Sequence, residues 1–255
     1  MTSGGVEMFA RYAYAPNRLG YCGPPDTAAL RDGSDEQVRA VARRFTGAWP
    51  YLRVMARMTG IADPLDKRLV ESYWLGGGVG AGLDPVEFTA ELMALLGPVA
   101  GVYWTHLTAE LADEAAANHC FHVFGVYPWS RLLRHGGGHP LHVLDSCRIR
   151  WGTVLDRTDT DIAVRCRRLG WDGQCLTLTA ETLLSVPIRV DGYAALPDVA
   201  VGESVAMHWG RLCGRLDDNQ VSVLEVGTVR QLEATNRRLR GRIRNSDTGG
   251  HLYLT

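Results

Sequence analysis

Residues 147–154 read Cys147-Arg-Ile-Arg-Trp-Gly152-Thr-Val154, and this is the first run in the chain with the pattern of a β-strand. After it, short β-branched segments alternate with turn residues, which indicates consecutive short strands. We predict strands at 147–155, 161–168, 174–179, 185–190 and 204–208, and a helix from 217 to about 238. Five short strands in about 65 residues are typical of a small barrel of the OB type.

The residues before this run carry helix signals. Ser34, Asp63 and Asp84 each offer a side-chain oxygen for a helix N-cap, with an acid or amide three residues later. From Asp84 onward apolar residues recur on one helical face, and 98–118 has similar spacing. The sequence therefore predicts an α+β protein, with an all-α helical domain over 1–142, an OB-like β-barrel plus helix over 143–238, and a basic flexible tail over 239–255.

The composition excludes several classes of protein. The 255 residues include 27 basic and 28 acidic side chains, so no overall field attracts nucleic acid or an anionic membrane. No run of 18 or more apolar residues occurs, and the first residues lack the basic and apolar regions of a signal peptide. We therefore expect a cytoplasmic protein with no nucleic-acid or membrane partner, in which the six cysteines stay reduced.

Two side chains in the predicted barrel could bind a metal together. Cys147 opens the first predicted strand, and His208 ends the last one, within Asp198-Val-Ala-Val-Gly202-Glu-Ser-Val-Ala-Met-His208-Trp-Gly210. A thiolate and an imidazole form a soft site that suits iron, copper or zinc. Two ligands alone hold a metal loosely, which suits a protein that passes the metal on. The neighbouring Arg148 is expected to lower the pKa of the Cys147 thiol.

From residue 147 to about 236 the chain resembles the HypC/HupF family of NiFe-hydrogenase maturation chaperones. The family pattern is a cysteine followed after four residues by glycine, then a Val-Gly…Val…His-x-Gly strand, then a helix with an acidic start. The matching positions are Cys147, Gly152, Val201, Gly202, Val205, His208, Gly210 and the run from Leu216-Asp217-Asp218 to Asn236. In the family the cysteine lies at the extreme N-terminus, whereas here it is internal.

The resemblance implies a role in metal-cofactor assembly. The resemblance implies that the thiolate of Cys147 binds the iron of an Fe(CN)2CO precursor. His208 would lie nearby, either as a ligand of the iron or as a group that orients a ligand. The partners that it implies are a HypD-like maturation protein and the large subunit of a NiFe hydrogenase.

Two other segments carry side chains with possible chemistry. The first is His119-Cys120-Phe-His122, which either connects helices as a buried segment or faces the barrel site and supplies a further ligand or a proton donor. The second lies between residues 9 and 24 and is either a pocket or interface element or ordinary N-terminal packing. Its candidate residues are Arg11, Tyr12, Asn17 and Cys22.

Two alternatives to the chaperone reading come from other classes of protein. One is an enzyme that acts on a small ligand through the helical part, with His119, Cys120, Tyr127 and Arg11 as catalytic groups, because histidine beside a cysteine can serve as a general base. The other is a metal-free interaction module that keeps only the shape of the barrel. The sequence favours the chaperone over both, and therefore a protein that is not an enzyme.

Overall fold

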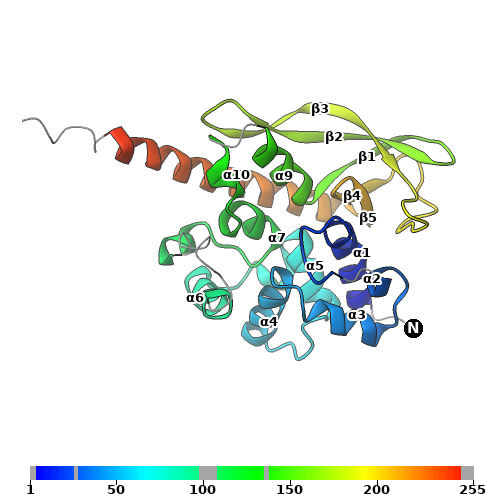
Figure 1. Ribbon diagram of the computed structural model, residues 1–255, viewed down its shortest axis with the longest axis horizontal. Coiled ribbons are helices and arrows are strands. Elements are labelled where there is room, and N and C mark those ends of the chain that lie inside the picture. The colour runs from blue at the N-terminus through cyan, green and yellow to red at the C-terminus, as the bar shows by residue number, and fades with distance from the viewer. Residues whose placement is uncertain (1–3, 26–27, 98–107, 135–137, 248–255) are drawn as a thin grey trace, which may run out of the picture.

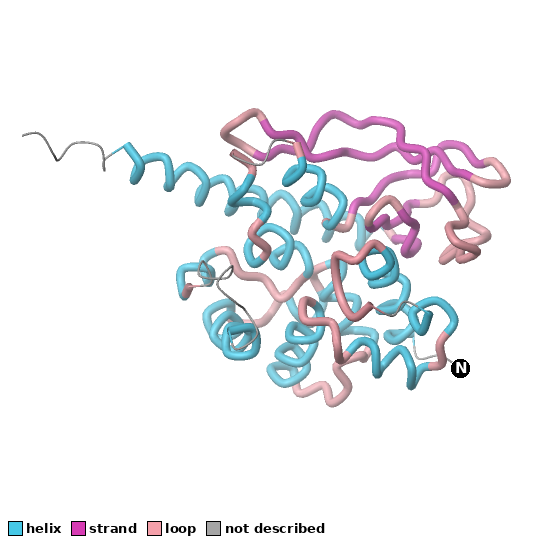
Figure 2. Tube along the Cα trace, in the orientation of Figure 1, coloured by secondary structure: helices cyan, strands magenta, loops and turns pink. Residues whose placement is uncertain are grey.

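The computed structural model describes residues 4–25, 28–97, 108–134 and 138–247. A layer of short helices lies against one face of an antiparallel sheet, and a long C-terminal helix runs beside both (Figures 1 and 2). The α+β class predicted from the sequence is therefore confirmed. The helices before the sheet are α1 (Gly4–Arg18), α2 (Ala28–Asp32), α3 (Asp35–Ala42), α4 (Ala48–Thr59), α5 (Lys67–Leu75), α6 (Pro85–Leu96), α7 (His119–Phe121), α8 (Trp129–Leu132) and α9 (His139–Cys147), with short irregular turns η1 (Gly78–Gly80), η4 (Ala109–Asp113) and η5 (His122–Val126).

Two of the three predicted N-caps are present. The Ser34 hydroxyl and the Gln37 side chain form a reciprocal capping box at α3, and the Asp84 carboxylate accepts from a backbone N–H at the start of α6. The third is displaced: Asp63 instead pairs with Arg39, at 2.8 Å, and Asp66 caps α5. The helix expected over 98–118 lies partly outside the described residues, and its described part is a short 3-10 turn followed by irregular chain.

The five strands form one antiparallel sheet in the order β3-β2-β1-β4-β5. The ladders link them as an open sheet, and they do not show the closed barrel that the sequence predicted. The strands predicted at 174–179 and 185–190 are a single strand, because β3 pairs with β2 along nearly its whole length. The strand bounds are β1 (Arg150–Arg157), β2 (Asp161–Trp171), β3 (Leu176–Pro187), β4 (Ser204–His208) and β5 (Arg211–Leu216).

Helices and sheet share a hydrophobic core. The main cluster contains most of the buried helix residues and also Ile149, Ala206 and Leu224 from beyond residue 142. The predicted boundary at 142 falls inside α9, which leads directly into β1. Helix α10 (Asp218–Asp247) continues into the predicted tail as far as residue 247, and residues 248–255 lie outside the described residues.

A buried ion cluster fixes the turn from α9 into β1. The Asp145 carboxylate accepts from the guanidinium groups of Arg148, at 3.0 Å, and Arg150, at 2.6 Å. It also accepts from the backbone N–H of Leu169 in β2, at 2.9 Å, with the half-exposed Arg168 at 3.4 Å. A buried charge is stable only when it is paired and hydrogen-bonded, and this one is both. The cluster therefore joins the end of α9 to two strands.

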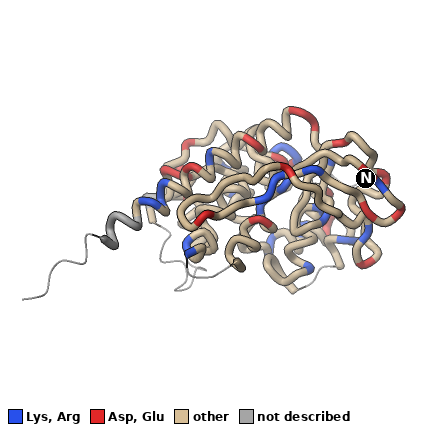
Figure 3. Tube along the Cα trace, turned by 90° about the horizontal axis from the view of Figure 1, so that it is seen from above, with Lys and Arg blue, Asp and Glu red and all other residues tan. Residues whose placement is uncertain are grey.

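Positions of basic and acidic residues are interspersed along the chain in Figure 3, in agreement with the small net charge. Among the described residues, no helix combines the length and the apolar character needed to cross a membrane.

Candidate metal centre

Three buried side chains meet where the helices contact the sheet. His119 from α7, Cys147 from the end of α9 and His208 from the end of β4 each place one possible ligand atom within 4.8 Å of the other two. Two of the three, Cys147 and His208, are the pair predicted from the sequence, and the third comes from the predicted segment His119-Cys120-Phe-His122. Separations of this size need only about 1 Å of contraction to match the geometry of a tetrahedral site with bonds near 2.0–2.3 Å.

His208 is placed by a tight hairpin turn. It pairs with Arg211 across a two-residue loop, and both loop residues, Trp209 and Gly210, have positive φ, 52° and 71°. This is the pattern of a type I′ turn, which explains the glycine after the His-Trp pair. The backbone N–H of Trp209 donates to the carbonyl of Ser146 at 2.8 Å, so the turn is tied to the last turn of α9.

Cys147 ends a helix and does not open a strand, so that sequence prediction is wrong. Pro140 lies in the first turn of α9, and Val143, Leu144 and Cys147 follow at helical spacing on its buried face. The helix stops because Arg148 adopts an extended conformation, with φ −64° and ψ 148°. The thiol therefore projects from a helix end toward the helical layer.

His119 is held by bonds on both ring nitrogens. The Asn118 side chain caps α7 by accepting from the N–H of Phe121, at 3.0 Å, and this fixes the residue that follows the cap. The His119 Nε2 lies 2.9 Å from the carbonyl oxygen of Cys147, and its Nδ1 lies 3.2 Å from the Tyr73 hydroxyl. A carbonyl can only accept, so Nε2 carries the proton and Nδ1 accepts from the Tyr73 hydroxyl.

The ring of His208 is also oriented by a hydrogen bond to a backbone carbonyl. Its Nδ1 lies 2.7 Å from the carbonyl oxygen of Tyr12 and therefore carries the proton. The ring also faces the backbone of Cys147, but Nε2 makes no hydrogen bond of normal geometry among the described residues. Histidines that bind metals usually donate their other ring N–H to a carbonyl or carboxylate. His208 does so with Nε2 unbonded among the described residues, whereas a metal that binds Nδ1 of His119 must displace the Tyr73 hydroxyl.

Burial keeps all three side chains uncharged in the metal-free protein. It lowers the pKa of His208 to about 4 and that of His119 well below its usual value. It raises the pKa of the Cys147 thiol well above its usual value. The expectation that Arg148 lowers this pKa is wrong, because its guanidinium pairs with Asp145 and is itself buried. A metal that binds Cys147 must therefore displace a proton.

The cluster lines a cavity of about 180 Å³. That is more room than a bare ion needs and is comparable to cavities that hold a small organic molecule. The walls are aromatic, sulfur and imidazole groups: Tyr21, Cys22, Tyr73, Trp74, His119, His122, Tyr127, Trp129, Cys147, His208 and Trp209, with Pro16, Ala48, Pro128 and Val143.

The structure brings several other predicted residues to this cavity. His122 lines it, buried and with neither ring nitrogen bonded among the described residues. Cys22 lines it from the loop after α1, which the Asn17 side chain shapes by donating to the carbonyls of Cys22 and Pro24, at 2.8 and 2.6 Å. Tyr12 contributes its backbone carbonyl to His208 and not its side chain. The segment 9–24 is mostly a buried helix and its loop.

Two predicted residues lie elsewhere. Cys120 points to the other side of α7, where its thiol interacts with Thr228 and lies near Arg148. It therefore does not join His119 and His122 in one cluster. Arg11 forms an ion pair with Glu7 of its own helix, at 3.3 Å, and does not line the cavity. In a short helix, consecutive residues face different directions, which separates 119 from 120.

Tyr73, Trp74 and Trp209 line the cavity but were not predicted from the sequence as site residues. Tyr73 and Trp74 lie on α5 in a run that looks like ordinary core packing, and only the fold shows that they contact His119. For Trp209 the usable signal was the neighbouring Gly210, because a glycine just after a predicted strand indicates a tight turn.

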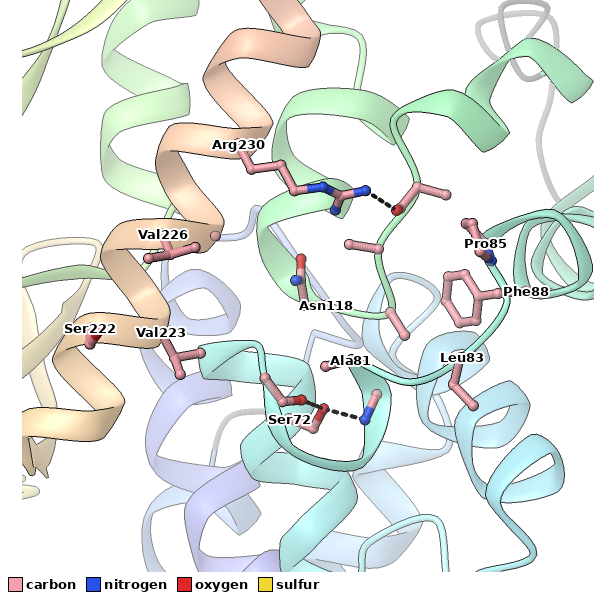
Figure 4. Close-up of a pocket in the computed structure, with 16 residues that line it drawn as sticks. Ser72, Ala81, Leu83, Pro85, Phe88, Asn118, Ser222, Val223, Val226 and Arg230 are labelled. Atoms are coloured by element: carbon pink, nitrogen blue, oxygen red, sulfur yellow. Dashed lines mark hydrogen bonds between the residues drawn. The ribbon is translucent and has the colours of Figure 1, made fainter.

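A larger cavity, about 470 Å³, lies between α5, α6 and α10 (Figure 4). It is lined mainly by glycine, alanine, valine and other apolar residues. Three of its four polar side chains, Ser72, Asn118 and Arg230, hydrogen-bond to backbone groups, and the fourth is Ser222. Among the described residues that line it there is no cluster of metal-ligating groups, so the smaller cavity is the candidate site.

Burial of neutral histidines makes the metal-free protein sensitive to acid. His208 and His122 titrate with pKa values of about 4 and about 3 when folded, against an ordinary value of 6.5. Below pH 6.5 the unfolded chain therefore binds more protons, so stability is complete above that pH and is lost as the pH falls toward 4. We expect the free energy of unfolding in urea to fall by about 2 kcal/mol for each buried histidine between pH 7 and pH 5.

The variants His122→Gln and His139→Gln give the matched comparison, because His139 is exposed. The His122 variant should lose less stability on acidification than the wild type, and the His139 variant should behave as the wild type does. An identical acid response in all three proteins would contradict the assignment of a neutral, buried His122.

Fold and site together define an α+β protein with a buried His–Cys–His cluster where its helices meet its sheet. Residues 1–242 match DUF6390, a family of unknown function, and the chain belongs to this family because the match covers almost all of it. No curated protein and no solved structure matches the chain.

Proposed function

We propose that this protein binds a metal through His119, Cys147 and His208 and carries it as cargo for another protein. The observation that carries the proposal is the cluster itself: three buried ligand atoms within 4.8 Å of one another, with both histidines already oriented by backbone carbonyls. Such orienting bonds are typical of histidines that bind metals.

The donor set suits a soft or borderline ion. One thiolate and two imidazoles fit iron, copper or zinc better than calcium or magnesium, which prefer oxygen. Three protein ligands leave a coordination position open, and all three line the cavity of about 180 Å³. The site therefore has room for a metal that brings small ligands of its own.

The cargo we propose is the Fe(CN)2CO group implied by the resemblance to the HypC/HupF family. A thiolate suits low-spin iron with strong-field diatomic ligands, and the cavity has the volume for them. The proposed partners are a HypD-like maturation protein that supplies the group and a NiFe-hydrogenase large subunit that receives it, in the cytoplasm. The open sheet would then be the counterpart of the family's small OB-like barrel.

The helical part completes the site in this proposal. His119 is a third ligand, so the metal is held more firmly than by the pair expected from the sequence. Helix α5 adds Trp74, which packs on both histidine rings at 4.8 and 5.6 Å. The helices thereby exclude water from the metal. An acceptor that offers more thiolates can still take the metal by ligand exchange.

The enzyme alternative receives less support from the geometry. It paired His119 with Cys120 as base and nucleophile, and these two side chains lie on different sides of α7. Nucleophilic catalysis requires the two groups within hydrogen-bonding reach.

Infrared spectroscopy on anaerobically purified protein, with iron measured on the same sample, tests the proposed function. Protein co-expressed with its maturation partners should show bands of metal-bound CO and CN⁻ that weaken strongly in the Cys147→Ala variant. Cys175→Ala is the matched control, because Cys175 is a half-buried cysteine in the β2–β3 turn, away from the cavity. Bands of undiminished intensity in the Cys147 variant, or iron-free wild-type protein with no bands, would contradict the proposal.

A further inference from the structure

We propose that the cavity contains a second metal position, formed by Cys22 and His122, through which the cargo passes on its way to and from the inner cluster of His119, Cys147 and His208. This inference rests on the proposed function and adds the path by which the metal reaches the inner cluster. It concerns two side chains that the inner cluster does not use.

The first support for the second metal position comes from the side chain of His122. Its side chain is 2% exposed, and neither Nδ1 nor Nε2 makes a hydrogen bond among the described residues. A buried polar group without a partner is costly and needs a reason. A ligand that occupies the cavity gives that reason, because His122 lines it.

Cys22 supplies the matching donor. A Cβ atom added at Gly47 would lie 2.9 Å from Nε2 of His122 and 3.7 Å from Sγ of Cys22, so both atoms border one point. Glycine at position 47 leaves that point free of any side chain. The Cys22 thiol also hydrogen-bonds with the Tyr127 side chain, which holds it on this side of the cavity.

The two donor sets are neighbours. The rings of His119 and His122 stack with centroids 6.0 Å apart, and the centroids of His119 and His208 are 5.1 Å apart. His119 is therefore a neighbour of a ring from each donor set. The Cys22 thiol is close enough to Cys147 to add to the effect of burial in raising the pKa of the Cys147 thiol.

The residues that line the cavity differ in how far they are exposed to solvent. The residues around the inner cluster, including Tyr73, Trp74 and Val143, are buried. The residues around Cys22 are more open: Tyr21 is 42% exposed and stacks on Trp209 at 3.8 Å, and Tyr127 is half-buried. Cys22 directly follows the exposed Tyr21, so we place the second position on the side of the cavity from which a metal enters.

The passage is a ligand exchange without redox change. Cys22 releases its proton when the metal binds and recovers one when the metal moves inward, while Cys147 releases its own proton to form the new metal–sulfur bond. His122 gives way to His119 and His208. Two donors exchange for three, so the inner position is the more stable one.

Anaerobic titration with Co²⁺ alone, followed by thiolate-to-cobalt charge-transfer absorption, tests the second position. In Cys147→Ala, a thiolate band should remain with affinity about 100-fold weaker than in the wild type, because two donors replace three. Adding Cys22→Ala should abolish that band, whereas adding Cys175→Ala should not. Circular dichroism of each variant verifies that it is folded.

The route is tested by stopped-flow mixing of Co²⁺ with wild type and with the single Cys22→Ala variant. Loading of the inner position should slow by about tenfold in the variant, while its equilibrium affinity stays near that of the wild type. Unchanged loading kinetics would overturn the route.

Failure of this inference differs from failure of the proposed function. A wild-type thiolate band that vanishes completely in Cys147→Ala, with that variant folded, overturns the second position and leaves the inner centre standing. A wild type without any Cys147-dependent band contradicts the proposed function instead.

Discussion

Replacement of Cys147 by alanine is expected to weaken metal binding by at least about 100-fold, with the fold retained. The thiolate is the only anionic donor among the three ligands, and two neutral imidazoles remain without it. The lost sulfur leaves a small gap next to the cavity that already exists, so the cost in stability should be about 1–2 kcal/mol. Competition with a chromophoric chelator for Zn²⁺ or Co²⁺ measures the affinity.

Two control variants separate ligation from packing. Cys213 is buried but does not line the cavity, and Cys175 is half-buried in a turn. Cys213→Ala should lose stability but not metal affinity, and Cys175→Ala should lose neither. A Cys147 variant whose affinity stays within about threefold of the wild type would remove Cys147 from the ligand set.

Replacement of Asp145 by alanine is expected to lower the free energy of unfolding by about 3–5 kcal/mol. The carboxylate lies between the buried guanidinium groups of Arg148 and Arg150, and its loss leaves both charges unpaired. It also removes the acceptor of the Leu169 N–H, which links α9 to β2. Urea denaturation monitored by circular dichroism measures the loss.

Arg168 provides the comparison for Asp145. It binds the same carboxylate but is 55% exposed, so Arg168→Ala should cost less than about 1 kcal/mol. Asp145 lies two residues before Cys147, so the Asp145 variant should also bind metal more weakly. If Asp145→Ala costs no more than Arg168→Ala, the ion cluster does not fix the end of α9.

The order of helices and strands was largely predictable, because it depends on local signals. The caps at Ser34 and Asp84 and the strand pattern after residue 150 lie within a few residues of what they determine. The prediction failed at segments whose secondary structure is determined by tertiary contacts. β3 is one strand because β2 pairs with it throughout, although residues 180–184 carry a weak strand pattern. β5 was missed because the Trp209-Gly210 turn is only two residues long.

The candidate site was predictable only in pieces. The patterns around Cys147 and His208 predicted both residues as candidate metal ligands, although Cys147 belongs to a helix and not to a strand. Nothing local connects residue 119 with residues 147 and 208, because they meet through packing of α7 against α9 and β4. The role of Tyr73 was hidden for the same reason, since a tyrosine on a buried helix face has the same pattern whether or not it contacts a ligand.

Crystals of the protein grown with Zn²⁺, with anomalous differences measured at the zinc edge, test the metal centre most directly. The account predicts a peak bonded to Cys147 Sγ at about 2.3 Å and to one nitrogen each of His119 and His208 at about 2.0–2.1 Å, and no peak there in Cys147→Ala. A folded wild-type protein without a peak among these three residues, or with its zinc bound elsewhere only, would contradict the claim that they form a metal site.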